Sequence, residues 1–264
     1  MAVSLPIFVR PLPYAAITTG NERSNRLASH LFVHEQIGIV WQTNGNANIW
    51  VRVDLGAVKD VDFIALLAAN ATSASKIRVR MGATQAEVDG AAPYDSGVLD
   101  FISPVITNDT GLYHSYLRLG TIQQRRWVRI DISGHTGDFI ASNLVIGAAF
   151  SSDKFYAPGT ESGVKDTGDM EISSSGAVAI LEGVKLRTIK VNYAWTGEAI
   201  YEGRFRALFE QHGRTKPFYM CFDPTANAYR NAKTYFGWFQ SEGYASGHKL
   251  AGKTEMATDM VSVI

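Results

Sequence analysis

One segment of the chain fits a known chemical motif, the phosphate-binding loop. Residues 247–254 read Gly-His-Lys-Leu-Ala-Gly-Lys-Thr and satisfy the pattern G-x-x-x-x-G-K-[ST]. Such a loop needs a strand before it, a helix after it and a parallel sheet that supplies an acidic partner for magnesium. Only ten residues follow Thr254, and the surrounding pattern is β. We therefore predict a glycine-rich loop without nucleotide, and no cofactor.

Two histidines, His30 and His34, are four residues apart and would share a metal ion if they lay on one helix. Glu35 follows the second histidine, so the order is not that of a metalloprotease helix. The remaining histidines show no ligand spacing; they are His114, His135, His212 and His248. We predict no metal site, with calcium in a sandwich loop left open although no dense Asp/Asn cluster marks one.

The sequence also lacks a pattern for covalent or hydrolytic catalysis. No G-x-S-x-G elbow occurs, and no pair of carboxylates is marked for glycoside hydrolysis; Asp109 is the only acid in the turn 108–111. The single cysteine, Cys221, excludes an intrachain disulfide and lies in the apolar run 218–222, which predicts a buried side chain. We predict that the chain is not an enzyme and has no catalytic residues, while its ligand-binding residues stay unknown.

Composition excludes two further classes of partner. The 264 residues hold 25 basic and 25 acidic side chains, divided as 12 and 12 in residues 1–150 and 13 and 13 in residues 151–264. Nucleic-acid binders carry a one-sided basic excess that is missing here. No run of about 18 apolar residues predicts a membrane span, and the start lacks the basic and apolar regions of a signal peptide. We expect synthesis in a cytoplasm without a removable export signal.

The pattern of the first half of the chain predicts short strands. Apolar and polar residues alternate, as in half-buried strands, within residues 50–55, 77–81, 116–119 and 127–132. The continuous apolar run 63–67 suits a central strand, and glycine- and asparagine-rich turns separate the runs. Short strands between such turns predict a β-sandwich.

The second half begins with a change of composition. Residues 151–175 are rich in Ser, Gly, Asp and Thr, which predicts a linker with a short strand at Met170–Ile172. Strands are predicted at 185–193, 218–222, 235–239 and 260–264. The expected domains are thus 1–150, the linker 151–175, and 176–264.

One helix is predicted, over residues 198–212. Its apolar residues recur at spacings of three and four and fall on one face. They are Tyr201, Phe205, Leu208, Phe209 and His212. Thr196 is the expected N-terminal cap, Glu198 favours the first turn, and Gly213 is the expected end.

The stretch from residue 28 to 132 resembles the galactose-binding-like, or discoidin-type, β-sandwich. The resemblance rests on Trp41, on Trp-Val-Arg-Val-Asp-Leu-Gly at 50–56, on the apolar strand 61–66, and on Arg-Trp-Val-Arg-Ile at 126–130. It implies a jelly-roll-type sandwich that binds carbohydrate, lipid head groups or protein through loops at one end. The loops in question are 34–48, 107–115 and 133–140.

The aromatic and basic residues of this region each have two interpretations. We expect Trp41 and Trp50 to be core anchors, since each ring buries a large area; an exposed platform for sugar stacking is the alternative. Five arginines lie on the polar faces of predicted strands, namely Arg52, Arg78, Arg80, Arg118 and Arg129. We expect them on a solvated or subunit-facing sheet surface, with a glycan or phosphate site as the alternative.

Residues 176–240 resemble hub modules of distal tail proteins from long-tailed bacteriophages. The shared features are Tyr-Ala-Trp-Thr-Gly at 193–197, the helix, Thr-Lys-Pro-Phe at 215–218, and Tyr-Phe-Gly-Trp-Phe at 235–239. The resemblance implies a β-barrel-like module that carries one amphipathic helix and forms rings by pairing strand edges. The order, with the sandwich first, departs from a plain distal-tail protein.

Two hypotheses of function follow. The first is a structural component of a bacteriophage tail tip or baseplate, assembled in the host cytoplasm and placed in the virion tail. Its partners would be further copies in a ring and other tail proteins, namely the tail tube, the hub and the end of the tape measure. The alternative is a carbohydrate-binding module of a bacterial or phage adhesion protein, with a host-surface glycan as partner.

Overall fold

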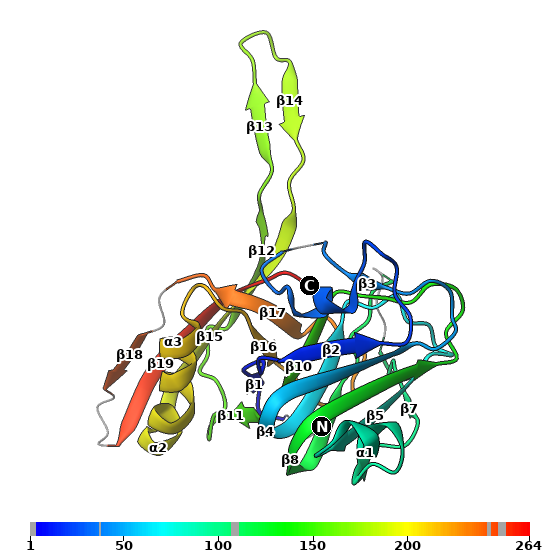
Figure 1. Ribbon diagram of the computed structural model, residues 1–264. Coiled ribbons are helices and arrows are strands. Elements are labelled where there is room, and N and C mark those ends of the chain that lie inside the picture. The colour runs from blue at the N-terminus through cyan, green and yellow to red at the C-terminus, as the bar shows by residue number, and fades with distance from the viewer. Residues whose placement is uncertain (1–3, 37, 107–110, 242–243, 248–251) are drawn as a thin grey trace. The chain divides into compact units, whose positions relative to one another are not determined.

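The structure is a computed structural model that describes residues 4–36, 38–106, 111–241, 244–247 and 252–264 (Figure 1). It is mainly β, as predicted. The chain forms two compact units. Unit 1 comprises Met1–Ser151 and Tyr219–Thr234, and unit 2 comprises Ser152–Phe218 and Tyr235–Ile264.

Two long strands organise the sandwich of unit 1. They are β4 (Trp50–Leu67) and β8 (Leu117–Ser133), and they pair antiparallel. The first part of β4 also pairs with β2 (Ala16–Thr19), and its last part pairs with β10 (Asn143–Gly147). The register shifts between Asp54 and Lys59, where Gly56 adopts a φ of 76° that favours glycine. The bulge lets one strand serve two parts of the sheet.

Strand β8 extends the sheet on its other side. It pairs with β5 (Lys76–Gly82), which in turn pairs with β6 (Tyr94–Asp95) and β7 (Leu99–Asp100). A short helix, α1 (Gln85–Asp89), follows β5 and starts with a capping box formed by Thr84 and Glu87. The 3₁₀ turn Ala28–Phe32 and the pair β3 (Trp41–Gln42) and β9 (Ile140–Ala141) complete this region.

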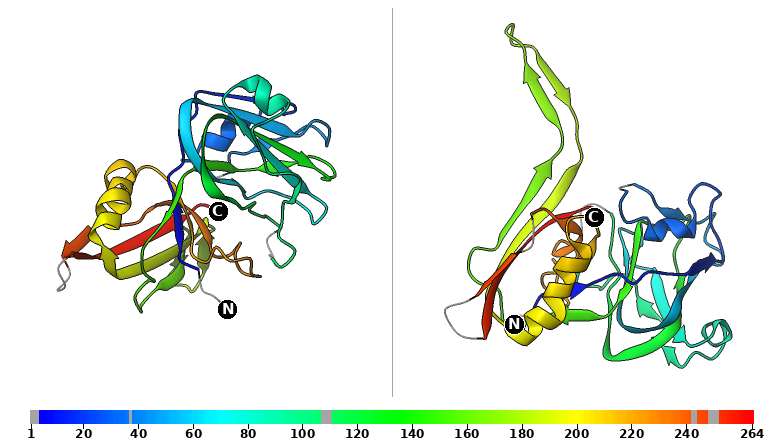
Figure 2. Two further views of the ribbon diagram at one scale, coloured as in Figure 1. Left: turned by 90° about the horizontal axis from the view of Figure 1, so that it is seen from below. Right: turned by 60° about the vertical axis from the view of Figure 1, so that its left-hand side comes forward.

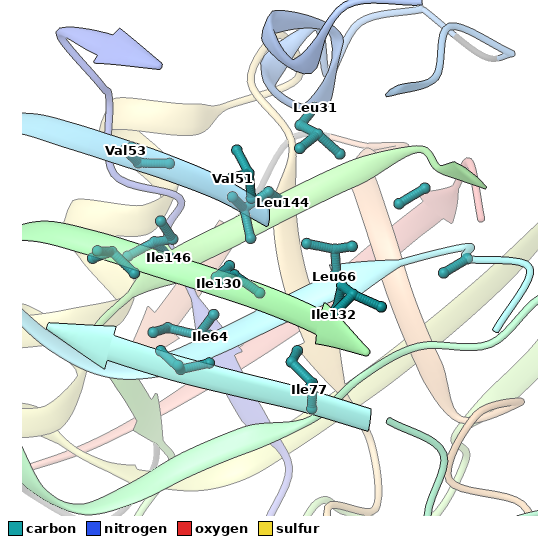
Figure 3. Packing of buried hydrophobic residues seen from close by; sticks show 14 of the residues in the cluster. Leu31, Val51, Val53, Ile64, Leu66, Ile77, Ile130, Ile132, Leu144 and Ile146 are labelled. Carbon is teal, nitrogen blue, oxygen red and sulfur yellow. The ribbon is translucent and has the colours of Figure 1, made fainter. Parts of the chain in front are cut away.

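Alternate residues of these strands form one buried cluster (Figure 3). Val51 and Val53 come from the first part of β4, while Ile64 and Leu66 come from its last part. Trp41 is fully buried among them, which confirms it as a core anchor. The predicted N-terminal β-sandwich is therefore confirmed.

A smaller group of strands also belongs to unit 1. Strand β1 (Ile7–Val9) pairs antiparallel with β11 (Ala149–Ser151) and with β16 (Phe218–Cys221). Cys221 is fully buried, as predicted, and burial raises the pKa of its thiol to about 11. The thiol is therefore protonated at neutral pH and is a poor nucleophile.

Unit 2 is built on an antiparallel sheet. Its strands follow the order β17 (Thr234–Phe239), β19 (Lys253–Ser262), β15 (Lys185–Gly197) and β12 (Glu161–Asp166). Strand β18 (Tyr244–Gly247) pairs with β19 beyond the end of β17. The prediction of a β-barrel-like module was wrong, because this sheet is open. Strand β12 pairs with β15 and then leaves the sheet, so it does not close a barrel.

One helical segment packs on this sheet, over the predicted residues. It comprises α2 (Glu198–Ile200), a π-helical turn (Tyr201–Phe205) and α3 (Arg206–His212). Phe205 and Leu208 are buried, and the ring of Phe209 lies 5.2 Å from that of Phe239. Gly213 ends the helix, as predicted.

The predicted helix cap was wrong. Gly197, rather than Thr196, is the capping residue, and no side chain caps the helix N-terminus. The Gly197 N–H donates to the carboxylate of Asp153 at 3.1 Å, while Thr196 is turned into the core. A bulge in β15 before Thr196 accounts for this change.

Much of the segment predicted as a linker lies in a long hairpin. Its far part consists of β13 (Asp169–Ile172) and β14 (Val178–Leu181), which pair with each other. Residues 166–182, here called the arm, extend well beyond the rest of unit 2 (Figures 1 and 2). Separate folding of 1–150 and 176–264 stays a prediction. In the described residues, no helix is both long and apolar enough to cross a membrane.

Candidate functional site

An open groove lies where β4 begins and β8 ends. Its volume is roughly 610 Å³, and it is here called the Trp50 groove. The lining residues are Asn46, Asn48, Ile49, Trp50, Arg129, Asp131, Ile132, Ser133, Gly134, His135 and Thr136. Trp50 and Asp131 are paired across the two strands, so they lie side by side. Two of the three loops predicted to bind ligand, 34–48 and 133–140, contribute to this groove, whereas residues 107–110 of the third lie outside the described residues.

Trp50 forms a wall of this groove. Its neighbours Ile49 and Val51 are buried in the core, whereas Trp50 itself is only half-buried. Gly20 makes room for the indole, because a Cβ at residue 20 would come within 2.2 Å of the Trp50 Nε1. The prediction of Trp50 as a core anchor was therefore wrong. The strand alternation turns its ring to the outer face of the sheet.

The loops beside the groove are held by side chains that are distant in sequence. The Asn21 amide donates to the carbonyl oxygens of Asn44 and Ala47, at 3.0 and 2.8 Å. The Asp138 carboxylate accepts from the Gly45 N–H at 2.7 Å, and this bond is the largest cause of its lowered pKa. Both clamps fix the loop that carries Asn46 and Asn48, so the groove is preorganised.

His135 lines the groove but serves the fold. It is buried; its Nδ1 lies 3.2 Å from the Ser75 hydroxyl, and its Nε2 lies 3.2 Å from the Asp138 carbonyl oxygen. Its ring packs edge-on against Phe139. Because both nitrogens have protein partners, His135 positions the 133–140 loop and is not placed for acid–base catalysis.

Other polar groups of the groove have unused hydrogen-bonding capacity. The side chains of Asn46, Asn48, Ser133 and Thr136 are exposed and make no side-chain hydrogen bond to another described residue. Two amides and two hydroxyls supply both donors and acceptors. They lie around a half-exposed indole, which adds an apolar surface.

The charged residues of the groove neutralise one another. The Arg129 guanidinium lies over the Trp50 ring, 4.4 Å from its centroid, and donates to Asp89 and Asp131. Asp131 also accepts from Arg80 at 2.8 Å, and Asp89 also accepts from Arg52. Burial opposes ionisation of Asp89, but the bonds and charges of Arg129 and Arg52 lower its pKa. The groove therefore offers little net charge to a ligand.

This pattern changes the interpretation of the five arginines. Arg52 and Arg80 are buried in the ion-pair network, so they do not form a solvated surface. Arg78 is half-exposed and pairs with Asp95, and Arg118 is exposed. The expectation of a solvated face was wrong for the buried arginines, because aspartates of β8 and α1 approach them from the same side.

The motifs singled out in the sequence do not form a site in the described residues. Gly247 and Thr254 are paired between two antiparallel strands, so a strand follows the segment that fits the phosphate-loop pattern, where a helix is required; residues 248–251 lie outside the described residues. The His30 Nδ1 lies 3.1 Å from the Val40 carbonyl oxygen, which accepts a hydrogen bond there, and burial lowers the pKa of His34. Among the described residues, no group of three or more potential metal ligands occurs.

The Trp50 groove presents uncharged polar groups beside one carboxylate. Its single carboxylate, Asp131, is used by Arg80 and Arg129 and is not paired with a second acid across the groove. The two loops were predicted, whereas Trp50 was predicted as a core anchor with an exposed platform as the alternative, and the roles of Asn21 and Asp138 were not predicted. No local pattern marks these clamps, because their partners lie 23 and 93 residues away.

Comparison with known proteins found solved structures similar to about half of the chain. A Streptococcus pneumoniae fucose binding module has 13% sequence identity and a TM-score of 0.39, over 53% of this chain and 95% of that one. A chitosan-binding module from Paenibacillus sp. IK-5 has 14% identity and a TM-score of 0.38, over 52% and 97%.

A third similar structure, SpGH29, has 15% identity and a TM-score of 0.40, over 52% of this chain. The chain spans only 28% of the length of that protein. No family model and no curated protein matches the chain. Identities and TM-scores this low do not carry a function from one protein to another.

Proposed function

We propose that the chain is a non-enzymatic carbohydrate-binding protein and that its sandwich holds a neutral sugar in the Trp50 groove. The observation that carries the proposal is the combination of a half-exposed indole with four polar side chains whose hydrogen-bonding groups are unused. A sugar ring presents C–H groups and hydroxyls together, so it matches an aromatic wall flanked by amides and hydroxyls. The surface or adhesion protein to which such a module belongs stays a proposal.

The neutral charge of the ligand follows from the ion pairs. Arg129 already donates to two carboxylates, and Asp131 accepts from two guanidinium groups. A charged ligand would have to compete with these protein partners. A neutral ligand leaves the network intact and uses the amides and hydroxyls instead.

A glycan array followed by calorimetry on the best neutral ligand tests the proposal. Trp50→Ala should weaken binding by about tenfold or more, as truncation of a central aromatic contact does. Trp127→Ala is the matched control, because Trp127 is also half-buried beside arginines but does not line the groove. Binding to no neutral glycan, or equal loss in both folded variants, would contradict the proposal.

We propose self-association as a second function, in a structural component of a bacteriophage tail tip or baseplate. The observation that favours it is the arm, whose apolar side chains are uncovered in the single chain. Ring formation, contacts with tail tube, hub and tape measure, and a place in the virion tail all belong to this proposal. Electron-microscopy class averages of the purified chain should contain rings; averages containing only single chains would argue against it.

A further inference from the structure

The two faces of the arm differ in character. Cross-strand pairing places Met170 opposite Ile180, and Ile172 opposite Val178, on one face. These four side chains are 53–70% exposed. The other face carries Asp169 and Glu171 opposite Leu181 and Ala179. One side of this two-stranded ribbon is thus apolar and exposed.

Such a ribbon is not stable on its own. A two-stranded hairpin is marginally stable at best in water and needs a further layer on its apolar face. Soluble proteins expose contiguous apolar surface chiefly where a partner binds. The apolar face of the arm therefore requires a partner.

Charge indicates that the partner is a second copy of the chain, bound through a different surface. The arm holds four acidic residues and no basic one, namely Asp166, Asp169, Glu171 and Glu182. The whole chain has 25 basic and 25 acidic residues, so the remainder has 25 basic and 21 acidic residues, an excess of four positive charges. Two arms repel each other, whereas an arm and the rest of another copy attract.

Unit 2 also carries an exposed aromatic pair suited to receive the arm. Outside the arm, the exposed large apolar residues of unit 2 in the described chain are two valines at the base of the hairpin, Val164 and Val184, and two aromatic residues, Phe155 and Trp195. The alternation of β15 buries Ile189, Val191 and Tyr193, but the bulge that follows buries Thr196 and leaves Trp195 53% exposed. A bulge is a recurrent device for turning one side chain outward.

Phe155 lies along the same stretch of β15 as Trp195. Residues on either side of Phe155 are bonded to that strand, since Asp153 accepts from Gly197 and the Ala157 N–H donates to Asn192. Lys154 and Lys253 lie in this region together with Asp153, which is 4.0 Å from Lys253, and with Glu255, which β19 places opposite the bulge. The aromatic pair is therefore an apolar surface bordered by charges of both signs, and its fit to the arm rests on the apolar contact and on the net positive charge of the rest of the chain.

We propose that the apolar face of the arm docks on the Phe155–Trp195 surface of a second copy, head to tail. The two surfaces lie on different parts of unit 2, at opposite ends of β15. Such a contact is heterologous, so it propagates from copy to copy and gives a ring if its rotation closes and a filament if it does not. The inference rests on the second proposed function, self-association, and adds which two surfaces meet.

Light scattering on the full chain tests the proposal with four variants. Met170→Ser with Ile180→Ser disables the arm, and Phe155→Ser with Trp195→Ser disables its acceptor. Ala179→Ser on the other arm face and Tyr229→Ser, an exposed aromatic of unit 1, are matched controls. We expect wild type and controls to have masses above the single-chain 28.9 kDa, and both disabled variants to have that mass. Loss of contact should raise the dissociation constant by about tenfold or more.

Mixing the two disabled variants tests directly whether the arm of one copy binds the acceptor surface of another. Each retains the surface that the other lacks, so the mixture should form a dimer of twice the single-chain mass and no larger ring. If the arm variant alone abolishes assembly, the arms pair with each other or with a different acceptor, and the head-to-tail contact is wrong. If wild type assembles and the arm variant does so equally, the arm proposal fails while self-association stands. A wild type that stays a single chain at its highest soluble concentration overturns both.

Discussion

The outer face of the sandwich and the arm of unit 2 are both strand surfaces that face away from a core. They differ in whether their side chains have partners within the chain. On the sandwich, Arg52, Arg80 and Arg129 are paired with aspartates of the same unit, so their charges are balanced within one chain. On the arm, Met170 and Ile180 have no cover from the described chain. A surface whose charged groups are paired within the chain can present a preorganised groove. A surface with exposed apolar side chains is suited to assembly.

The largest expected effect separates two tryptophans of the sandwich. Trp41 is fully buried and donates to the Asn21 carbonyl oxygen at 3.2 Å. Trp41→Ala should lower the free energy of unfolding by about 3–5 kcal/mol, measured by urea denaturation. Trp50→Ala should cost distinctly less, because its ring is half-buried. Equal losses in the free energy of unfolding would indicate that Trp50 is a core residue and would contradict its place as a wall of the groove.

The ion-pair network should show the next largest effect. Asp131→Ala leaves Arg80 and Arg129 without one acceptor each, and their side chains are only 10% and 15% exposed. We expect a loss of about 2 kcal/mol in the free energy of unfolding. Glu210→Ala is the matched control, because it removes an exposed pair with Arg206 on the helix. A change no larger than that of the control would contradict a self-completed sandwich face.

Proteolysis compares the two regions without mutation. The arm is exposed along its length, so limited digestion of dilute protein should cut first within 166–182. Mass spectrometry of the first fragments identifies the site. A first cut within β4 or β8 would contradict the expectation that the arm is the less protected region. Slower cutting of the arm at higher protein concentration would support docking on another copy, since a docked arm is protected.

The smallest expected effect is an acid dependence at the edge of the sandwich. The side-chain bond to Arg78 is the main cause that lowers the pKa of Asp95 to about 2, from an ordinary value of 3.8. The stabilising contribution is therefore full above about pH 4 and is lost as the pH falls toward 2. Asp95→Asn should lower the melting temperature slightly at neutral pH and by distinctly less at pH 2, where about half of the Asp95 carboxyl is protonated. A difference at pH 2 as large as that at neutral pH would exclude this ion pair as its cause.

The sequence predicted repetitive features better than individual contacts. Period-two alternation predicted the principal strands, and spacings of three and four predicted the helix 198–212, because these patterns depend on neighbouring residues. Trp41 and Trp50 look alike in sequence, but only their places in the strands separate a core anchor from a groove wall. The open sheet of unit 2 was also missed, because a departing strand such as β12 has no local signature.

The groove illustrates the same limit. Its loops were predicted, but the clamps at Asn21 and Asp138 depend on folding that brings distant segments together. Residues 166–175 of the arm fall within the predicted linker 151–175, because serine and glycine are frequent there and form the tip at 173–176. Its apolar alternation at Met170 and Ile172 was the signal available, and it predicted a short strand but not its partner β14.

The central claim is that the arm depends on another copy of the chain and the sandwich does not. Hydrogen exchange of the full chain, measured over a series of protein concentrations, tests it directly. We predict that amides of β13 and β14 exchange more slowly as concentration rises, while those of β4 and β8 exchange at a constant rate. Arm amides that are fully protected at the lowest concentration, or unprotected at every concentration, would contradict the claim.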